Sequence, residues 1–195
     1  MTKWIATGLI SLFLTSCGMV GGPVSGVVLD AETRQPIEGA FVVAKWSGSS
    51  PATIADSQTV CIYIDMARTD EKGRFRIPMW LFEKPGVSGQ WRGVRIYRPG
   101  YMEVWPREDD ELLVKKADVD VKERIKQMYG IVSHTSCGGN DKARVSLYPL
   151  AVALYEESLS LAGGKYDKDI VEPFLYDKEV FEIGEELAFK RHLER

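Results

Sequence analysis

The sequence predicts an α+β protein in which an antiparallel β-sandwich is followed by a mainly helical C-terminal region. Three observations support this class. Short alternating apolar segments, separated by turns that contain Gly, Pro and Asp, fill residues 23–107. Apolar residues recur at helical spacing over much of residues 108–195. The 195-residue chain is 45% hydrophobic and 27% charged with a formal net charge of -3, which favours a folded protein and argues against a nucleic-acid partner.

The first 16 residues have the layout of a secretory signal peptide. Lys3 and the amino terminus form a short positive region, and a mostly apolar run from Trp4 to Leu14 precedes two small residues. This run is too short for a transmembrane helix, which needs about 20 residues. We therefore expect residues 1–16 to be removed.

Cys17 is the predicted site of lipidation. The run Leu14-Thr15-Ser16-Cys17 has the lipobox pattern of an aliphatic residue, two small residues and a cysteine. Two or three acyl chains, at about 0.8 kcal/mol per buried methylene, hold a protein on a membrane, whereas one chain does not. The segment resembles the start of mature diderm lipoproteins, in which Asp after the cysteine favours retention in the inner membrane. By this resemblance, Gly18 favours the outer membrane, facing the periplasm. The alternative is an ordinary signal peptide with an incidental cysteine. Residues 17–22 are predicted to be a lipidated flexible tether.

The two other cysteines, Cys61 and Cys137, are predicted to form a disulfide. An exported protein folds in a compartment that oxidises paired thiols. The bridge would connect residues 76 positions apart and would stabilise the folded protein by about 4 kcal/mol in the chain-entropy model. It would connect the sandwich to the helical region. The alternative is two buried thiols.

Within the sandwich, the patterns predict strands at residues 24–29, 41–46, 59–68, 74–78 and 93–97, with a short apolar piece at 102–105. The turn at residues 70–73 is predicted to join two of them into a hairpin. Val60, Ile62 and Ile64 are expected to share one buried face. Residues 47–57 are expected to be an irregular excursion.

Three motifs in order resemble the carboxypeptidase regulatory-like domain. The first motif, which resembles the opening segment of that domain, comprises Val24-Ser25-Gly26-Val27-Val28, Asp30, Thr33, Pro36-Ile37, Gly39-Ala40 and Val42. The domain's Thr-Asp-x-x-Gly-x-Phe segment is resembled by the run from Thr69 to Phe75, and its Gly-Tyr close by Pro99-Gly100-Tyr101. The resemblance covers residues 23–105. It implies a transthyretin-like sandwich that serves binding, assembly or stability and supplies no catalytic residues.

The C-terminal region shows three groups of apolar residues at helical spacing. Gly163 and Gly164 are predicted to end the second helix, and Asp109, Asp110 and Glu111 to lie at the start of the helical region. The groups are Ile125, Met128, Tyr129 and Val132; Leu147, Leu150, Ala151 and Leu154; and Val180, Ile183 and Leu187.

Few residues have a spacing that indicates catalysis or metal binding. His134 and Cys137 form only half of a zinc pattern, and the adjacency of Ser133 and His134 does not itself make a catalytic pair. Asp65 and Asp70 are interpreted as a strand residue and a turn residue. The sequence therefore predicts no enzyme, no metal and no cofactor.

The aromatic residues leave a second function open. Trp46, Trp80, Trp91, Trp105, Tyr97 and Tyr101 are numerous for a small sandwich. An exposed row of them would stack on a sugar ring, although core packing explains them equally well. The favoured hypothesis is a non-catalytic envelope lipoprotein that acts as a structural module or binds another envelope protein. The alternatives are a carbohydrate-binding lipoprotein, with a glycan as partner, and an unrecognised envelope enzyme.

Overall fold

The computed structural model describes residues 19–51, 57–82, 87–105, 111–137 and 141–193, which form nine strands and three helices. The predicted signal peptide and the predicted lipidation residue Cys17 lie outside the described residues. The strands are β1 (Met19–Gly21), β2 (Val24–Asp30), β3 (Phe41–Pro51), β4 (Ser57–Arg68), β5 (Arg74–Ile77), β6 (Trp80–Phe82), β7 (Ser88–Tyr97), β8 (Tyr101–Glu103) and β9 (Glu111–Lys116). The helices are α1 (Val121–Thr135), α2 (Asp141–Leu161) and α3 (Glu172–Leu193).

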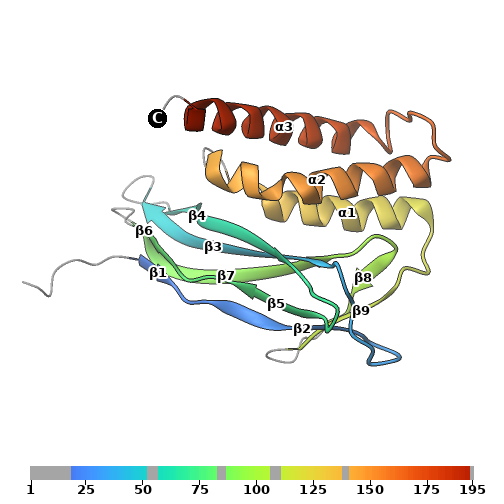
Figure 1. The fold of residues 1–195 in the computed structure, drawn as a ribbon, viewed down its shortest axis with the longest axis horizontal. Helices are drawn as coiled ribbons and strands as arrows, with labels where there is room; N and C mark the ends of the chain where they lie inside the picture. The colour runs from blue at the N-terminus through green and yellow to red at the C-terminus, as the bar shows by residue number, and fades with distance from the viewer. Residues whose placement is uncertain (1–18, 52–56, 83–86, 106–110, 138–140, 194–195) are drawn as a thin grey trace, which may run out of the picture.

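The strands form two larger sheets and one small pair. The outer sheet has the order β5-β2-β9-β8, and the middle sheet has the order β4-β3-β7. All neighbours are antiparallel except β2 and β9, which run parallel. β1 and β6 pair with each other at one end of the molecule, and the helices cover the far side of the middle sheet (Figure 1). The predicted α+β class and the sandwich-like arrangement are confirmed.

The outer and middle sheets pack face to face around one apolar core. Inward and outward side chains alternate along β5 and β9, as expected for strands with one buried face. The outer sheet contributes Val24, Val28, Phe75, Ile77, Leu112 and Val114 to this core, and the middle sheet contributes Val42, Ala44, Trp46, Ile62 and Ile96.

The middle sheet is also covered by the helices, so both of its faces are buried. In β3, Val42 and Ala44 contact the core between the sheets, while Phe41 and Val43 contact the helix-side core. A strand buried on both faces needs no polar position, which explains the unbroken apolar run at its start. The helix-side core adds Ile125, Met128 and Ile131 of α1, Leu147, Leu150 and Leu154 of α2, and Phe174 of α3.

Local sequence sets the helix ends. The Asp120 carboxylate accepts a hydrogen bond from the Glu123 amide at 2.9 Å and caps α1. Gly163 and Gly164 have φ angles of 68° and 75°, and the Gly164 amide donates to the Leu159 carbonyl at 2.8 Å. This left-handed turn closes α2. The prediction that the two glycines end the second helix is confirmed.

A β-bulge in β4 decides which face Cys61 occupies. The partners of Cys61 and Tyr63 on β3 are consecutive residues, so Ile62 is the extra residue of the bulge. Ile62 and Tyr63 both contact the core between the sheets, whereas Cys61 and Ile64 contact the helix-side core. The prediction that Ile62 and Ile64 share a face is wrong because the bulge interrupts the two-residue period.

The predicted hairpin of residues 59–68 and 74–78 is also wrong. β4 pairs with β3 and β5 pairs with β2, so the chain crosses from one sheet to the other at this turn. The turn itself forms as expected. Gly73 has a φ of 69°, and the Asp70 carboxylate accepts hydrogen bonds from the amides of Lys72 at 2.9 Å and Arg74 at 2.8 Å.

The predicted boundaries change at two other places. Glu111–Lys116 forms β9 inside the outer sheet and not the start of the helical region, so the sandwich-like part extends to Lys116 and the helices begin at Val121. Six residues with an apolar pair at alternate positions do not distinguish a strand from a helix by period. In the predicted flexible tether, Met19–Gly21 forms β1, and in the predicted excursion the strand β3 continues to Pro51. Asp109 and Asp110 lie outside the described residues.

Candidate functional site

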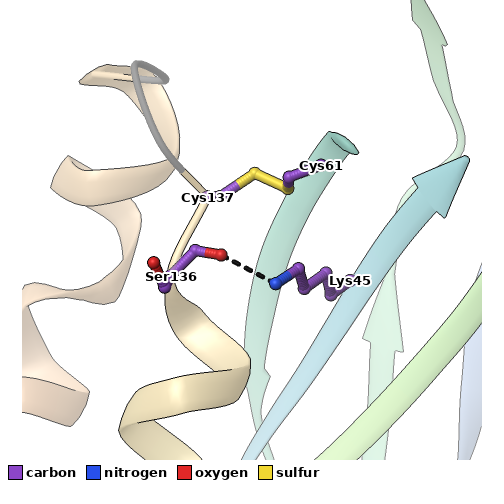
Figure 2. Close-up of a disulfide and its surroundings, with 4 residues drawn as sticks. All are labelled: Lys45, Cys61, Ser136 and Cys137. Atoms are coloured by element: carbon purple, nitrogen blue, oxygen red, sulfur yellow. Dashed lines mark hydrogen bonds between the residues drawn. A yellow bond between two sulfur atoms is a disulfide. The ribbon is translucent and has the colours of Figure 1, made fainter. Parts of the chain in front are cut away.

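The disulfide joins the middle sheet to the helical layer. Cys61 lies on β4, and Cys137 lies just after α1 (Figure 2). Their Cα atoms are 5.3 Å apart, inside the range of native disulfides. The predicted Cys61–Cys137 pairing is confirmed.

A lysine fixes the same connection at a second point. The ammonium of Lys45, on β3, donates a hydrogen bond to the carbonyl oxygen of Ser136 at 2.7 Å (Figure 2). The carbonyls at a helix C-terminus carry a partial negative charge that favours a cation there. Burial lowers the pKa of Lys45. Together with the disulfide, this contact holds the chain after α1 against the sheet.

A buried ion pair lies between α1, α2 and the turn after β7. The side chains of Arg124 and Glu157 are 5% and 9% exposed. Nε of Arg124 donates to Oε1 of Glu157 at 2.9 Å, and Nη2 donates to Oε2 at 2.9 Å. Glu157 also accepts from the hydroxyl of Tyr97 at 2.6 Å and the amide of Gly100 at 3.0 Å, and Arg124 donates to the carbonyl of Tyr101 at 2.6 Å. Bidentate charged pairs of this kind are strong and specific in geometry.

The hydrogen bonds and charges of this network set the protonation states of Glu157 and Tyr97. Burial alone would raise the pKa of Glu157, but the hydrogen bonds from Arg124 and Tyr97 and the charge of Arg124 outweigh it and hold the pKa below its ordinary value. Burial, followed by the charge and hydrogen bond of Glu157, raises the pKa of Tyr97 far above its ordinary value. The carboxylate stays ionised and the phenol stays a donor. The network therefore locks the helices onto the sheet.

The ion pair of Arg124 and Glu157 was not predicted, although the spacing of these residues in the sequence indicates it. Arg124 precedes Met128 and Ile131 at helical spacing, and Glu157 follows Leu150 and Leu154 in the same way. A charged residue within an apolar stripe must find a partner when the stripe is buried. Opposite charges in two such stripes indicate an ion pair between the helices.

A cavity of about 530 Å³ lies between the two sheets beside β7. Its size is typical of small-ligand sites. Residues of β2, β5, β7 and β9 and of the end of α1 form its walls. Its polar lining side chains are Arg92, Arg95, Ser25 and His134, and no carboxylate lines it among the described residues. The exposed indole of Trp105 lies at the same cavity. This lining suits a ligand with anionic or hydroxyl groups and a flat apolar face.

Arg95 and Trp105 are held in place by Glu103 and by each other. Nη1 of Arg95 lies 2.8 Å from Oε2 of Glu103, and the guanidinium lies 5.8 Å from the Trp105 ring centroid. A second hollow of about 240 Å³, toward α1, shares both residues. Arg95 and Trp105 thus form a wall that the two hollows share.

The six aromatic residues do not form one exposed row. Trp46, Trp80 and Tyr97 are 3%, 6% and 2% exposed and belong to the two cores, and Tyr101 packs partly buried against the core between the sheets. Trp91 and Trp105 are 45% and 59% exposed. A sugar-stacking surface would therefore depend on these two residues.

The candidate carboxylates have structural partners. Asp70 stabilises the turn described above and forms an ion pair with Arg74 at 2.8 Å. Asp65 accepts hydrogen bonds from the Met66 amide at 2.8 Å and the Tyr63 hydroxyl at 3.3 Å. Glu111 pairs with Arg34. These contacts stabilise turns and strands.

The described residues contain no group of three or more His, Cys, Asp or Glu side chains that could hold a metal ion. Ser133 and His134 lie in the last turns of α1 and not in a loop. The His134 ring lies against Gly93, where an added Cβ would be 2.8 Å from Cε1. Cys137, the other half of the zinc pattern, is in the disulfide.

Comparison with known proteins adds no relative. No family model, no curated protein and no solved structure matches the chain. Across the part of the chain that the structure describes, no helix is long and apolar enough to cross a membrane.

Proposed function

We propose that this protein is a non-catalytic lipoprotein of the cell envelope, anchored through acylated Cys17 in the outer membrane and facing the periplasm, where it acts as a protein-interaction or structural module. The observation that carries the proposal is the disulfide between Cys61 and Cys137. The chain has three cysteines, so this bridge leaves Cys17 as the one available for acylation. A structural disulfide is expected in an oxidising compartment, which agrees with export by the predicted signal peptide.

We also propose that the sandwich-like part, in which residues 23–105 carry the resemblance and β9 completes the outer sheet, is a transthyretin-like domain of the carboxypeptidase regulatory-like type. The motif from Thr69 to Phe75 has a structural role at each specified position, which supports the resemblance. The Thr69 hydroxyl donates to the Ile37 carbonyl at 2.7 Å and accepts from the Ala40 amide at 2.8 Å. Asp70 and Gly73 form the turn, and Phe75 enters the core. Such a domain binds, joins or stabilises other proteins.

The test of the anchor compares the wild-type chain with Cys17→Ala in a diderm bacterium. Cells are extracted with a detergent that separates into two phases, and the outer membrane is isolated by density. We expect the wild type in the detergent phase and the outer membrane, and the variant in the aqueous phase, because only the wild type carries acyl chains. Recovery of both proteins in the aqueous phase would contradict the anchor.

The interaction role is tested in the same cells. Chemical crosslinking before lysis, followed by purification of the wild-type chain and mass spectrometry, should recover the same envelope protein in repeated experiments. Cys17→Ala serves as the matched control, since it keeps the folded surface and loses the membrane location. Recovery of uncrosslinked wild type alone would argue against a protein-interaction module.

A second candidate function is glycan binding in the cavity beside β7. The observation that favours it is the joint presence of Arg92, Arg95 and the exposed Trp105 at one cavity with no described carboxylate in its lining. An acidic polysaccharide would place a carboxylate on the guanidinium of Arg92, since Arg95 already pairs with Glu103, and a ring face on the indole. Retention on an immobilised acidic polysaccharide should fall for Trp105→Ala and Arg92→Ala. Trp91→Ala, exposed but outside the cavity lining, is the control, and equal retention of all three variants would remove this candidate.

A further inference from the structure

The end of the molecule nearest the predicted anchor carries two exposed aliphatic side chains. Met79, just before β6, is 58% exposed, and Leu81, within β6, is 72% exposed. Trp80 between them is 6% exposed and contacts the ring of Trp46 in the core. Because side chains alternate along an extended chain, Met79 and Leu81 lie on the same outward face. We refer to these two residues as the Met79–Leu81 patch.

Strand pairing links this patch to the start of the mature chain. β1 runs antiparallel to β6, with Val20 opposite Leu81 and Gly21 opposite Trp80 (Figure 1). The Trp80 indole lies over Gly21, where a methyl group would overlap the ring. β1 is therefore held on the folded domain and does not act as a loose tether.

Covalent geometry then limits the distance between the patch and the lipid. Cys17 precedes Met19 by two residues, and an extended chain spans at most about 3.6 Å per residue, or about 7 Å here. A single helix with its side chains is about 10–12 Å across. A folded partner therefore does not fit between the anchor and this end of the domain, which favours the bilayer as the surface that meets the patch.

We propose that the Met79–Leu81 patch inserts into the phospholipid surface when Cys17 is acylated, so that the β1–β6 end of the domain faces the membrane. This inference rests on the proposed lipid anchor. Long aliphatic side chains gain from burial at the acyl boundary, and the short link keeps them there. Because β1 and β6 lie at one end of the long axis, the helical layer, which extends toward the other end, would remain accessible to periplasmic partners (Figure 1).

The test uses the full-length protein made in a diderm bacterium, with the photoreactive residue benzoylphenylalanine in place of Leu81. The purified protein is reconstituted into vesicles of phosphatidylethanolamine and phosphatidylglycerol and irradiated. The matched control carries the same residue in place of Tyr176, which is 68% exposed in the first turns of α3, at the opposite end of the molecule (Figure 1). Intact mass reports both the acyl chains and any lipid adduct. We expect lipid adducts at position 81 at least tenfold more often than at position 176.

The outcomes separate the inference from the anchor. If the acyl mass is present but position 81 forms no more lipid adduct than position 176, the inference is overturned and the anchor stands. If the acyl mass is absent, both are overturned. Irradiation of whole cells adds a third outcome, since a protein adduct at position 81 in place of lipid would overturn the membrane contact in favour of a docked protein. With the photoreactive residue kept at position 81, Met79→Glu should lower the yield of lipid adducts while the acyl mass remains.

Discussion

The ion pair of Arg124 and Glu157 gives the sharpest prediction about what holds the helices on the sheet. Glu157→Leu removes an acceptor of four hydrogen bonds and leaves the Arg124 guanidinium, 5% exposed, without its counter-charge. Removal of one partner of a buried pair costs about 3–5 kcal/mol. We expect Glu157→Leu and Arg124→Met each to lower the free energy of unfolding by this amount.

The double variant distinguishes a pair from two independent contacts. With both charges replaced by apolar side chains of similar size, no buried charge remains. The Tyr97 hydroxyl keeps the Ala153 carbonyl at 3.0 Å, and the exposed Gly100 amide can bind water. We therefore expect the double variant to lose only about 1–2 kcal/mol relative to wild type. The two single effects would then be strongly non-additive.

Urea unfolding of the Cys17→Ala chain with its disulfide intact, followed by circular dichroism, measures these changes. Glu182→Gln is the matched control, because its ion pair with Lys178 at 3.2 Å lies on the surface of α3. An exposed pair contributes about 0–1 kcal/mol, so this variant should unfold almost as wild type does. If Glu157→Leu lowers the free energy of unfolding no more than Glu182→Gln does, or if the double variant loses the sum of the single effects, the ion pair does not hold the helices on the sheet.

Three further predictions follow from the same structure. The folded-state pKa of Glu157 lies below its ordinary value of 4.5, so its contribution to stability is present above about pH 4.5 and is lost as the pH falls through the folded-state pKa. The difference in the free energy of unfolding between wild type and Glu157→Gln should therefore shrink below that pH in urea titrations. A difference that stays constant with pH would contradict this prediction. Replacement of both Cys61 and Cys137 by Ser removes a covalent link between residues with a sequence separation of 76. This change should lower the free energy of unfolding by about 4 kcal/mol in the same titrations. An unchanged urea midpoint would show that the bridge adds no stability. Gly73→Ala places a Cβ 2.5 Å from the Val28 carbonyl oxygen at a residue whose φ is 69°. It should lower the thermal unfolding midpoint more than Gly100→Ala, because Gly100 has a similar φ of 75° but no atom within 4 Å of the added Cβ. Equal shifts of the midpoint would mean that only the backbone angle matters.

The sequence predicts the strands and helices well where one period is sustained. The alternation in β2 and β5 and the apolar stripes of α1 and α2 identify these elements, because burial on one face imposes the period directly. The turn at residues 70–73 is also predictable, since Asp70 and Gly73 have local reasons to be there. Pairing is different. Whether β5 joins β4 or β2 depends on contacts between distant segments, which no local pattern encodes.

The position of Cys61 shows how a single residue changes the outcome. Cys61 and Tyr63 are two residues apart and would share a face in a regular strand, on the side of the sheet away from Cys137. The extra residue Ile62 turns Cys61 toward the helices. The disulfide was predictable because two cysteines remain once Cys17 is assigned to lipidation. The bulge that makes the disulfide geometrically feasible was not predictable, because the local sequence does not show that a strand contains an added residue.

The candidate sites also differ in whether a local sequence pattern can predict them. The cavity beside β7 combines Arg92 and Arg95 from one strand with Phe75, Leu112 and His134 from three other elements. The sequence places the two arginines and Trp105 near one another along the chain, but their common cavity depends on how the two sheets face each other. Cys17 is the opposite case, since its proposed role depends on a local run of four residues that a peptidase and an acyltransferase read before the domain folds.

The lipid anchor is tested by the intact mass of the mature protein purified from membranes, together with sequencing of its N-terminal peptide. We expect a chain that begins at Cys17 and carries the added mass of two or three acyl chains, with the mass of Cys61 and Cys137 reduced by two hydrogens for the disulfide. A mature chain that begins elsewhere, or one that begins at Cys17 with no acyl mass, would contradict it.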